Sequence, residues 1–345
     1  MTNQKTDLFF SVKYNYVLFV GTDYAKNLIF RDLLGKDTVK IFSKSSFFRS
    51  RILSFLFRFA FSKKVNKHCK ILGKSFWFRT IIRQCHFPNK LPLVFIFNQS
   101  WHDVSFIIWL QKKYPEIIRI LFLDDTIDFC VRNMPHFALS SLKKEYNLIL
   151  SYNPLDSVRY DLLQTRVYFS RIPLAMLERR EKVKLVFVGY AKDRLPLVLS
   201  IYDKIKQKVS CNFIIVGSHE CYFQGDGLCF IKKEMPYLAY LSYEVASDCI
   251  LEVIKGDTQG CTYRVWEAVY YNKKLLTNWK GIFTFPYYNP KYMRYFETVE
   301  DIDINFLCSE ETVDYGYANE NSPIHLLNSI DNILDKKYLH SNSIQ

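Results

Sequence analysis

Residues 252–278, EVIKGDTQGCTYRVWEAVYYNKKLLTN, combine glycines, a cation and a carboxylate around the start of a predicted helix. A strand pattern leads into a glycine-containing loop, and the helix is predicted to begin near Thr262. The backbone N–H groups from Gly260 to Thr262 would then lie at a helix N-terminus, whose partial positive charge attracts anions. Arg264 and Glu267 are three residues apart and share one face of this helix. The cation suits a diphosphate, and the carboxylate can accept hydrogen bonds from the paired hydroxyls of a ribose.

Two further cations follow an apolar run that ends at Gly189, in the sequence LVFVGYAKDR. Lys192 and Arg194 could bind phosphate there, or they could be solvated loop charges. Arg264 and Glu267 could likewise form an ordinary exposed ion pair, since helices often carry such pairs three residues apart. The residues alone therefore predict a nucleotide-binding loop and leave both interpretations open.

The scaffold for these groups is predicted by alternating strand and helix patterns from residue 182 onward. Apolar runs of strand length alternate with segments of helical periodicity, which indicates a parallel sheet covered on both faces. The strands are expected at 184–189, 212–217, 229–232, 249–254 and 274–278, and the helices at 195–205, 235–246 and 262–272.

The N-terminal half has a similar but less regular pattern. Its strands are expected at 16–21, 38–42, 93–98, 118–123, 148–152 and 167–171, with a helix at 104–113. A proline and a run of charges at 172–182 indicate a linker. We therefore predict an α/β chain with two Rossmann-like domains facing each other across a cleft. Their expected bounds are 1–172, which includes a basic helical segment at 38–90, and 182–310, followed by a helical tail at 311–345.

Composition narrows the class of protein. The chain has 345 residues, of which 49% are hydrophobic, so a mainly disordered chain is excluded. Its nine cysteines form no C-x-x-C pair, so free thiols are expected rather than a metal site. The G-x-G-x-x-G motif is absent, so no dinucleotide cofactor is expected. Neither a signal peptide nor a membrane-spanning segment is predicted.

The net charge of +13 comes from one region. No acidic residue occurs between Asp37 and Asp103, whereas 13 Lys and Arg residues do. Within it, residues 46–64 (SFFRSRILSFLFRFAFSKK) predict a helix with an apolar face and with Arg51 and Arg58 on another face. This pattern is typical of a helix lying in an anionic membrane surface. The predicted apolar face comprises Phe48, Ile52, Phe55, Leu56 and Phe59.

Two other interpretations of this basic segment stay open. It could be a core helix of the N-terminal domain with a solvated basic rim. Basic and aromatic residues together also occur in nucleic-acid-binding proteins, but no RRM, OB or zinc pattern supports that role. No nucleic-acid partner is expected.

The sequence QGCTYRVWEAVYYNKKLLTN resembles the donor-site signature of GT-B glycosyltransferases, roughly G-x-T-x-x-x-x-E-A followed by a strand. It is most similar to a bacterial branch that acts in polysaccharide and lipopolysaccharide assembly. LVFVGYAKDR at 185–194 and SYNPLDSVRYDL at 151–162 resemble two other segments of that fold. The matches cover about a third of the chain, mostly in its C-terminal half.

The resemblance implies roles for individual residues of the donor domain. Glu267 would hold the nucleotide ribose, while Gly260 and Thr262 would line the phosphate. Arg264, Lys192 and Arg194 would neutralise the diphosphate leaving group without a metal ion. The remaining donor-site candidates are Gln259, Gly189 and Tyr237. Gly189 could instead be a plain strand-ending turn, and Tyr237 could stack on the nucleobase or be an ordinary core or rim residue. Many retaining members have Glu at the position of Gln259, so a retaining mechanism is not implied.

Three residues of the N-terminal domain, which carries the acceptor site in this fold, are candidates for a catalytic base. His102 follows the strand at 93–98, and Asp124 and Asp125 end the strand at 118–123. The alternatives are a local hydrogen bond between His102 and Asp103, and helix capping or solvation for the two aspartates.

The resemblance predicts an enzyme that moves a sugar from a nucleotide-diphosphate sugar to a glycan or lipid-linked glycan acceptor. The pathway would be surface polysaccharide synthesis, such as capsule or lipopolysaccharide, with no metal and no cofactor besides the donor. The protein would be cytoplasmic and peripheral to the inner face of the cell membrane. The alternative is a non-catalytic module that binds a nucleotide sugar or a polyanionic glycan.

Overall fold

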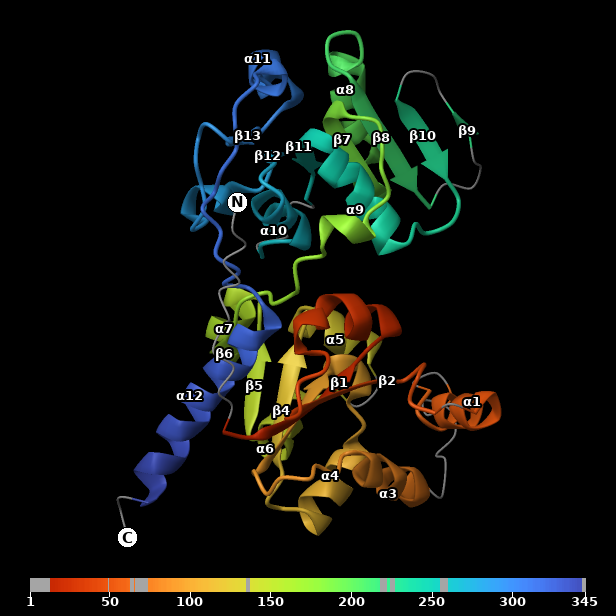
Figure 1. Cartoon of the computed structure of the whole chain (residues 1–345), viewed down its shortest axis with the longest axis vertical. Coiled ribbons are helices and arrows are strands. Elements are labelled where there is room, and N and C mark those ends of the chain that lie inside the picture. The colour runs from red at the N-terminus through yellow and green to blue at the C-terminus, as the bar shows by residue number, and fades with distance from the viewer. Residues whose placement is uncertain are drawn as a thin grey trace. The chain divides into compact units, whose positions relative to one another are not determined.

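The computed structural model describes residues 13–48, 50–62, 65, 74–134, 137–217, 222–223, 227–254 and 260–342. It divides the chain into two compact units, and each is built around its own mainly parallel sheet (Figure 1). The first unit runs to Ser170 and resumes at Glu320, and the second unit comprises Arg171–Asn319. The C-terminal residues therefore belong to the first unit, whereas a separate tail from residue 311 was expected.

The first unit has six parallel strands in the order β2-β1-β3-β4-β5-β6. Strands β1 and β3 are almost wholly buried apolar runs, as expected for a parallel sheet with both faces covered. The strands are β1 (Asn15–Val20), β2 (Val39–Ser43), β3 (Leu93–Asn98), β4 (Ile118–Leu123), β5 (Leu148–Ser151) and β6 (Leu163–Gln164).

The expected strand at 167–171 is wrong. The backbone N–H of Phe169 donates to the Asn321 carbonyl, and that of Ser170 donates to the Ile29 carbonyl. These bonds fix the segment against loops of the first unit rather than in a sheet. The sixth strand is the short β6 instead.

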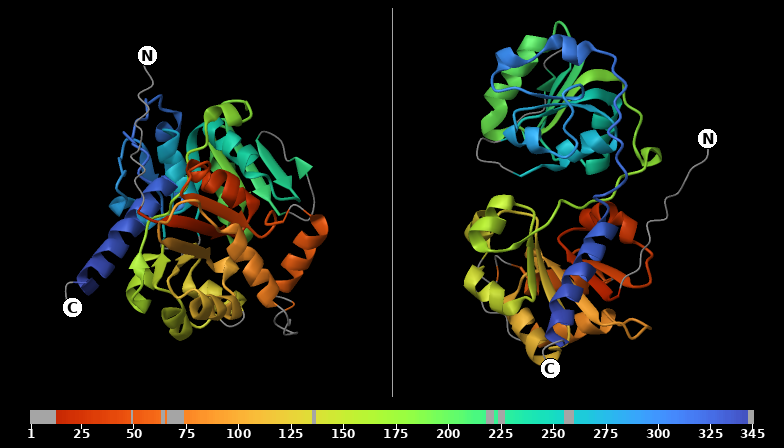
Figure 2. Two further views of the ribbon diagram at one scale, coloured as in Figure 1. Left: turned by 60° about the horizontal axis from the view of Figure 1, so that its bottom comes forward. Right: turned by 90° about the vertical axis from the view of Figure 1, so that its left-hand side faces the viewer.

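Helices cover both faces of the first sheet. Val17 and Phe19 of β1 point into an aromatic core shared with the helices that follow β2, β3 and β4. Tyr16 points to the other face, where its hydroxyl donates to Asp331 of the last helix, α12. Helix α12, blue at the C-terminus, lies along this sheet (Figure 2). The helices are α1 (Arg51–Ala60), α3 (Lys74–Gln84), α4 (Val104–Lys113), α5 (Ile127–Asn133), α6 (Leu139–Glu145), α7 (Pro154–Tyr160) and α12 (Pro323–Asn342).

The second unit has seven strands in the order β13-β12-β11-β7-β8-β10-β9. All pair in parallel except β9, which is antiparallel to β10. The strands are β7 (Val183–Tyr190), β8 (Cys211–Val216), β9 (Tyr222–Phe223), β10 (Leu228–Ile231), β11 (Ser247–Glu252), β12 (Lys274–Thr277) and β13 (Met293–Tyr295). The α/β class with two parallel sheets is thus confirmed.

Four helices pack on the second sheet. Those on one face, α8 and α11, share an apolar core with alternate residues of β7, β8 and β11. Those on the other face, α9 and α10, pack against β7, β11 and β12. The helices are α8 (Leu195–Ile205), α9 (Tyr237–Ala246), α10 (Tyr263–Tyr270) and α11 (Ile304–Cys308). Within the described residues, none of the helices of either unit is both long and apolar enough to cross a bilayer.

Candidate functional site

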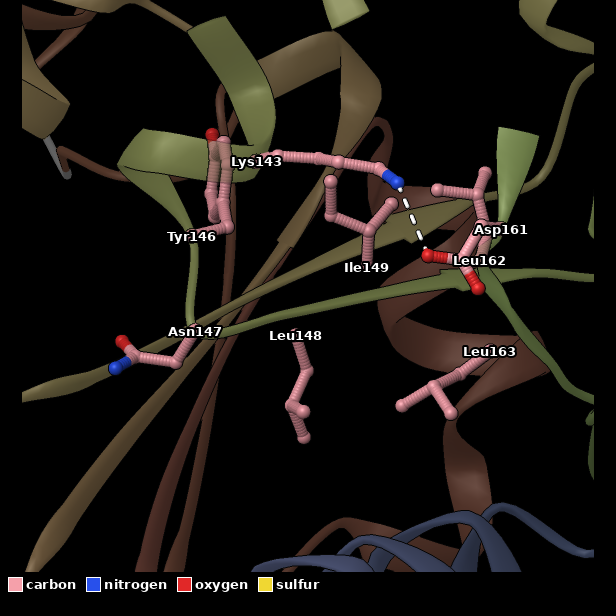
Figure 3. A pocket seen from close by; sticks show the side chains of 8 residues that line it. All are labelled: Lys143, Tyr146, Asn147, Leu148, Ile149, Asp161, Leu162 and Leu163. Atoms are coloured by element: carbon pink, nitrogen blue, oxygen red, sulfur yellow. Dashed lines mark hydrogen bonds and ion pairs between the residues drawn. The ribbon is translucent and has the colours of Figure 1, made fainter. Parts of the chain in front are cut away.

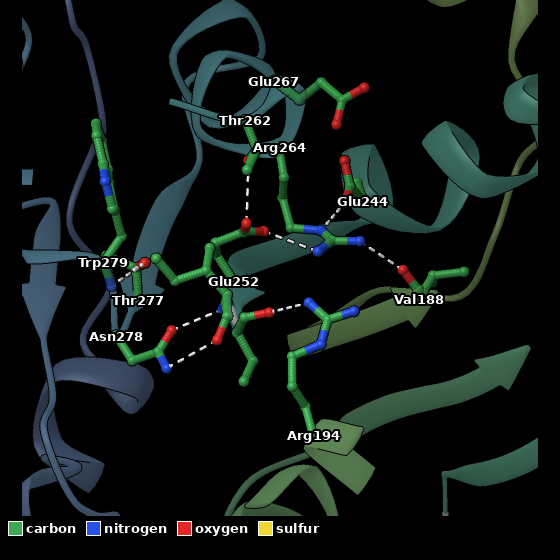
Figure 4. Close-up of polar contacts among 12 residues, drawn as sticks. Val188, Arg194, Glu244, Glu252, Thr262, Arg264, Glu267, Thr277, Asn278 and Trp279 are labelled. Carbon is green, nitrogen blue, oxygen red and sulfur yellow. Dashed lines mark hydrogen bonds and ion pairs between the residues drawn. The ribbon is translucent and has the colours of Figure 1, made fainter. Parts of the chain in front are cut away.

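The carboxyl edge of the second sheet gathers most of the donor-site residues predicted from the sequence (Figure 4). Gly189 lies at the end of β7, and Lys192 and Arg194 form the single 3-10 turn that follows. Gly260 and Thr262 lie just before α10, which begins at Tyr263. Ligands of open α/β sheets bind at this edge. Gln259 lies outside the described residues.

Arg264 is held inside the protein by groups from three other elements. Its Nη1 donates to Glu252 Oε2 at 2.7 Å, and its Nε lies 3.1 Å from Glu244 Oε1. Its Nη2 donates to the carbonyl of Val188 at 2.6 Å. The side chain is only 15% exposed. Arg264 is therefore not an exposed helix-surface residue, and its bonds fix α10 against β7, α9 and β11.

Glu267 is fully buried, at 0% exposure. The Tyr237 hydroxyl donates to its Oε1 at 2.6 Å, and the Tyr240 hydroxyl lies 3.1 Å from its Oε2. Both tyrosines come from α9, so the carboxylate points toward that helix. An exposed ion pair between Glu267 and Arg264 is excluded, because Arg264 makes its ion pairs with Glu244 and Glu252.

Glu244 completes a buried carboxyl pair with Glu267. Burial and the neighbouring Glu267 carboxylate raise the pKa of Glu244 well above its usual range. Its Oε2 is buried and has no partner among the described residues, so a proton on this atom would supply a donor toward Glu267. Burial also raises the pKa of Glu267, while hydrogen bonds and Arg264 oppose that shift. We assign the proton to Glu244 and the negative charge to Glu267.

The rim of this cluster is cationic and more open. Lys192 is exposed and adopts a left-handed backbone conformation, with φ of 50°. Arg194 is half-buried, and its guanidinium donates to the carbonyls of Ala191, Tyr190 and Val253. Burial lowers the pKa of Arg194, but an arginine stays charged at neutral pH. A charged guanidinium at a strand edge suits an anionic ligand.

Gly189 is required by the close approach of Arg264. Its φ is 153°, and a Cβ at this position would lie 3.3 Å from Arg264 Nη2. A side chain here would press on the guanidinium that holds α10 in place. Gly189, which was expected to end a strand, therefore leaves room for Arg264, in addition to the donor-site role that is predicted for it.

Thr262 leaves the N-terminus of α10 without a side-chain cap. Its hydroxyl donates to Glu252 Oε1 at 3.0 Å instead of accepting a bond from the helix backbone. A helix start without such a cap suits an anion, because its N–H groups carry partial positive charge. The expected phosphate-binding geometry at Gly260 and Thr262 is thus compatible with the structure.

Sequence reasoning missed Glu244, Glu252, Tyr240 and Asn278. Glu252 ends the apolar strand CILE, and a charged residue in a buried strand indicates that it has a partner. Asn278 follows β12, and its side-chain amide bonds both backbone groups of Ile254. Tyr240 and Glu244 are hydrogen-bonded to each other on α9, four residues apart, but their spacing could not show that both also contact Arg264 of α10.

In the first unit, Asp124 and Asp125 lie at the carboxyl edge of their own sheet, directly after β4. Asp124 accepts from Asn98 Nδ2 at 2.7 Å and from the Gln99 amide. Asp125 accepts from Gln99 Nε2 at 3.1 Å. Asp124 is exposed and Asp125 is half-buried, so solvent can reach both carboxylates. The expectation of helix capping is wrong for this pair, because the residue that caps α5 is Thr126.

His102 lies in a different environment. Its Nδ1 is 3.0 Å from the Tyr146 hydroxyl, and its ring packs edge-on against Phe137. The expected local pair with Asp103 is replaced by this contact, because Asp103 caps α4 and forms an ion pair with Lys74. His102 is thus packed among aromatic rings, whereas Asp124 and Asp125 lie at the strand ends.

A pocket of about 230 Å³ lies beside β5 (Figure 3). Lys143 and Asp161 form an ion pair of 3.3 Å across it. It contains none of the predicted site residues. The other lining residues are Tyr146, Asn147, Leu148, Ile149, Leu162 and Leu163.

Among the residues that the structure describes, no three His, Cys, Asp or Glu side chains are grouped so that they could hold a metal ion.

Comparison with known proteins finds no matching family model and no matching curated sequence. Several solved structures are similar at low identity. The Glycosylation Associate Protein (Gap123) complex from Streptococcus agalactiae has a TM-score of 0.45 and 12% identity over 79% of this chain. This chain spans only 58% of the length of that protein.

Two other similar structures cover nearly the whole chain. A UDP-forming trehalose-phosphate synthase from Burkholderia xenovorans has a TM-score of 0.48 and 8% identity, over 95% of this chain and 98% of that one. An alpha-glucosyltransferase in complex with UDP and DNA has a TM-score of 0.46 and 10% identity, over 92% and 90%. Because all three TM-scores lie below 0.5, the functional argument depends on the site itself.

Proposed function

We propose that this chain is a GT-B glycosyltransferase that moves a sugar from a nucleotide-diphosphate sugar to an acceptor hydroxyl. One observation carries the proposal. The carboxyl edge of the second sheet carries Lys192, Arg194 and the start of α10, which has no side-chain cap. The buried cluster of Arg264 and Glu267 lies beside them. Positive charge at this edge would stabilise the diphosphate as it leaves, when its negative charge grows.

The buried cluster of Arg264, Glu244, Glu252 and Glu267 would position the sugar nucleotide rather than neutralise the charge of its diphosphate. Arg264 already bonds the carboxyl groups of Glu244 and Glu252 and the Val188 carbonyl, and the Glu252 carboxylate balances its charge. The phosphate contacts therefore fall to Lys192, Arg194 and the N–H groups before α10. Glu267 would accept the ribose hydroxyls once the Tyr237 hydroxyl moves away from Oε1. The Tyr237 ring, half-buried at the start of α9, would then line the nucleobase.

The acceptor is proposed from the resemblance of residues 259–278 to enzymes of polysaccharide and lipopolysaccharide assembly. A glycan or a lipid-linked glycan destined for the cell surface fits that class. Asp124 or Asp125 would take the proton of the acceptor hydroxyl in an inverting reaction, since both are carboxylates at the strand ends that solvent can reach.

Thermal unfolding with a panel of sugar nucleotides tests the donor site. We expect one UDP-, GDP- or dTDP-sugar to raise the melting temperature, because a ligand that binds only the folded state stabilises it. CMP-sugars, which have one phosphate, should bind less well. Release of nucleotide on adding acceptor then tests for transfer, and binding without release for any acceptor would indicate a non-catalytic module.

A pair of matched variants locates the phosphate contact. Lys192→Gln is expected to weaken binding of the nucleoside diphosphate by about fivefold, because the contact of an exposed lysine with phosphate is screened by solvent and is worth about 1 kcal/mol. Lys208→Gln removes the same charge from an exposed residue just before β8, at the opposite end of the sheet, and should leave binding unchanged. Equal affinities for both variants would exclude Lys192 from the site.

A further inference from the structure

Helix α1 of the first unit presents an apolar face to solvent. Ile52 is 72% exposed, Phe55 67%, Phe59 49% and Leu56 45%. These residues recur at helical spacing, so they form one continuous face of α1. Large side chains exposed together in this way mark an interaction surface rather than scattered surface residues.

The opposite side of α1 anchors the helix to the core. Phe57 is fully buried, and its ring lies 5.0 Å from Phe47, 5.6 Å from Trp77 and 5.9 Å from Trp101. Ala60 is also buried. The interpretation as a core helix with a solvated basic rim thus holds for one side of α1, whereas the predicted apolar face at Ile52 and Phe55 does not face the core.

Phe48 was expected on the exposed face and is not part of it. It precedes α1, and its ring packs on Phe47, Phe57 and Trp77 at 5.0–5.5 Å. The exposed face is thus limited to the helix itself, from Ile52 to Phe59.

The charged residues of α1 and of its neighbour α3 are all cationic. Arg51 and Arg58 are exposed on α1, and Arg79 and Arg83 are exposed on the adjoining helix α3. The segment between Asp37 and Asp103, which supplies both helices, has no acidic residue. The first aromatic residue of α3, Phe76, is also 64% exposed.

We propose that this face of α1 docks on an anionic membrane surface. Ile52, Phe55, Leu56 and Phe59 would enter the boundary between headgroups and acyl chains, with α1 lying parallel to the membrane. The arginine stems would lie along that boundary while their guanidinium groups reach lipid phosphates. The attachment is independent of the donor site in the second unit.

Charge and side-chain shape favour this occupant over two others. In a symmetric pair of copies joined through α1, Arg51 and Arg58 would lie against the same residues of the partner, which like-charge repulsion opposes. A single-stranded nucleic acid could stack its bases on Phe55 and Phe59, but Ile52 and Leu56 on the same face are aliphatic and give the bases no ring to stack on.

Cosedimentation of the full chain with vesicles tests the proposal. We expect binding to vesicles of phosphatidylcholine with phosphatidylglycerol, none to phosphatidylcholine alone, and weaker binding as salt rises. Phe55→Ser with Phe59→Ser should lower partitioning at least tenfold at every salt concentration. Arg51→Gln with Arg58→Gln should lower it at low salt by about fivefold for each arginine.

The matched control changes the same kinds of residue on α7. Leu155 and Val158 are 52% and 84% exposed, and Arg159 is exposed beside them. Leu155→Ser with Val158→Ser, and separately Arg159→Gln, should leave vesicle binding unchanged. Because all the substituted side chains are at the surface, we expect every variant to fold. Thermal unfolding of each variant checks this.

Three results would overturn the proposal. One is the absence of wild-type binding to anionic vesicles at low salt. Another is equal loss of binding in the α1 and α7 variants. The third is a wild-type dimer, seen by sedimentation, that Phe55→Ser with Phe59→Ser dissociates while vesicle binding persists, because it would assign the face to a second copy.

Discussion

Arg264 and Glu252 form an ion pair inside the second unit, with 2.7 Å between Nη1 and Oε2 and exposed fractions of 15% and 3%. The pair joins the first turn of α10 to the last residue of β11. The loop that is predicted to bind phosphate connects these two elements. The ion pair therefore fixes both ends of the candidate donor site.

Removing Arg264 should destabilise the protein. Arg264→Ala leaves the Glu252 carboxylate buried without its cation, and breaking such a pair costs about 3–5 kcal/mol. Chemical denaturation measures the loss. Arg159→Ala, at an exposed arginine, is the control and should change the free energy of unfolding by less than about 0.5 kcal/mol. A loss below about 1 kcal/mol for Arg264→Ala would show that solvent or another cation replaces the guanidinium.

The raised pKa of Glu244 predicts the pH dependence of stability. A carboxyl group whose pKa is raised by folding binds more protons in the folded state than in the unfolded state. The free energy of unfolding therefore falls as pH rises from about 4.3, the pKa of Glu in the unfolded chain, through the pKa in the folded state. One such group contributes at most about 1.4 kcal/mol per pH unit. Glu244→Gln mimics the neutral carboxyl, so it should match or exceed wild-type stability at pH 7 and reduce this slope. Urea denaturation at several pH values measures it, and an unchanged slope would contradict the assigned proton.

Much of the fold was predictable because buried parallel strands have a simple signature. The expected bounds of β3, β4 and α4 agree with the structure to the residue. The two strands are short, mainly apolar runs, and α4 begins after its cap Asp103 and ends at Lys112 and Lys113. The same signature misled at Tyr168 and Phe169, which are 7% and 1% exposed without belonging to a strand. A short buried segment is apolar whether or not it pairs with a sheet, so an apolar sequence alone does not distinguish a strand from a buried loop.

The candidate site was predictable only in part. The spacing of Arg264 and Glu267 placed both on one helix, but it could not show what each contacts. The partners of Arg264 lie 12 to 76 residues away on three other elements. Contacts of that range depend on the order of strands in the sheet, and local spacing carries no information about it.

Glu267 should matter for donor binding more than Glu244. Glu267→Gln removes the charge expected to accept the ribose hydroxyls, and the loss of a charge-assisted contact costs about 1.5–3 kcal/mol, or roughly tenfold to a hundredfold in affinity. Calorimetry with the preferred nucleotide measures it. Glu244→Gln is the matched control in the same buried pair, and its affinity should stay within about threefold of wild type. If both variants bind as tightly as wild type, neither carboxyl contacts the nucleotide.

Transfer should continue in EDTA. The Asp-x-Asp sequence of the chain, at Asp301 and Asp303, is used for capping, because Asp301 accepts from the Glu297 and Thr298 backbone N–H groups and Asp303 caps α11. The predicted phosphate edge carries Lys192 and Arg194 instead. Cations of the chain can neutralise a departing diphosphate as a magnesium ion would. We therefore expect equal rates of nucleotide release with EDTA and with Mg²⁺, and a lower rate for Lys192→Gln under both conditions. The prediction would be contradicted by a rate that requires Mg²⁺ and is the same for Lys192→Gln and the wild type. A bound metal ion, rather than Lys192 and Arg194, would then stabilise the leaving diphosphate.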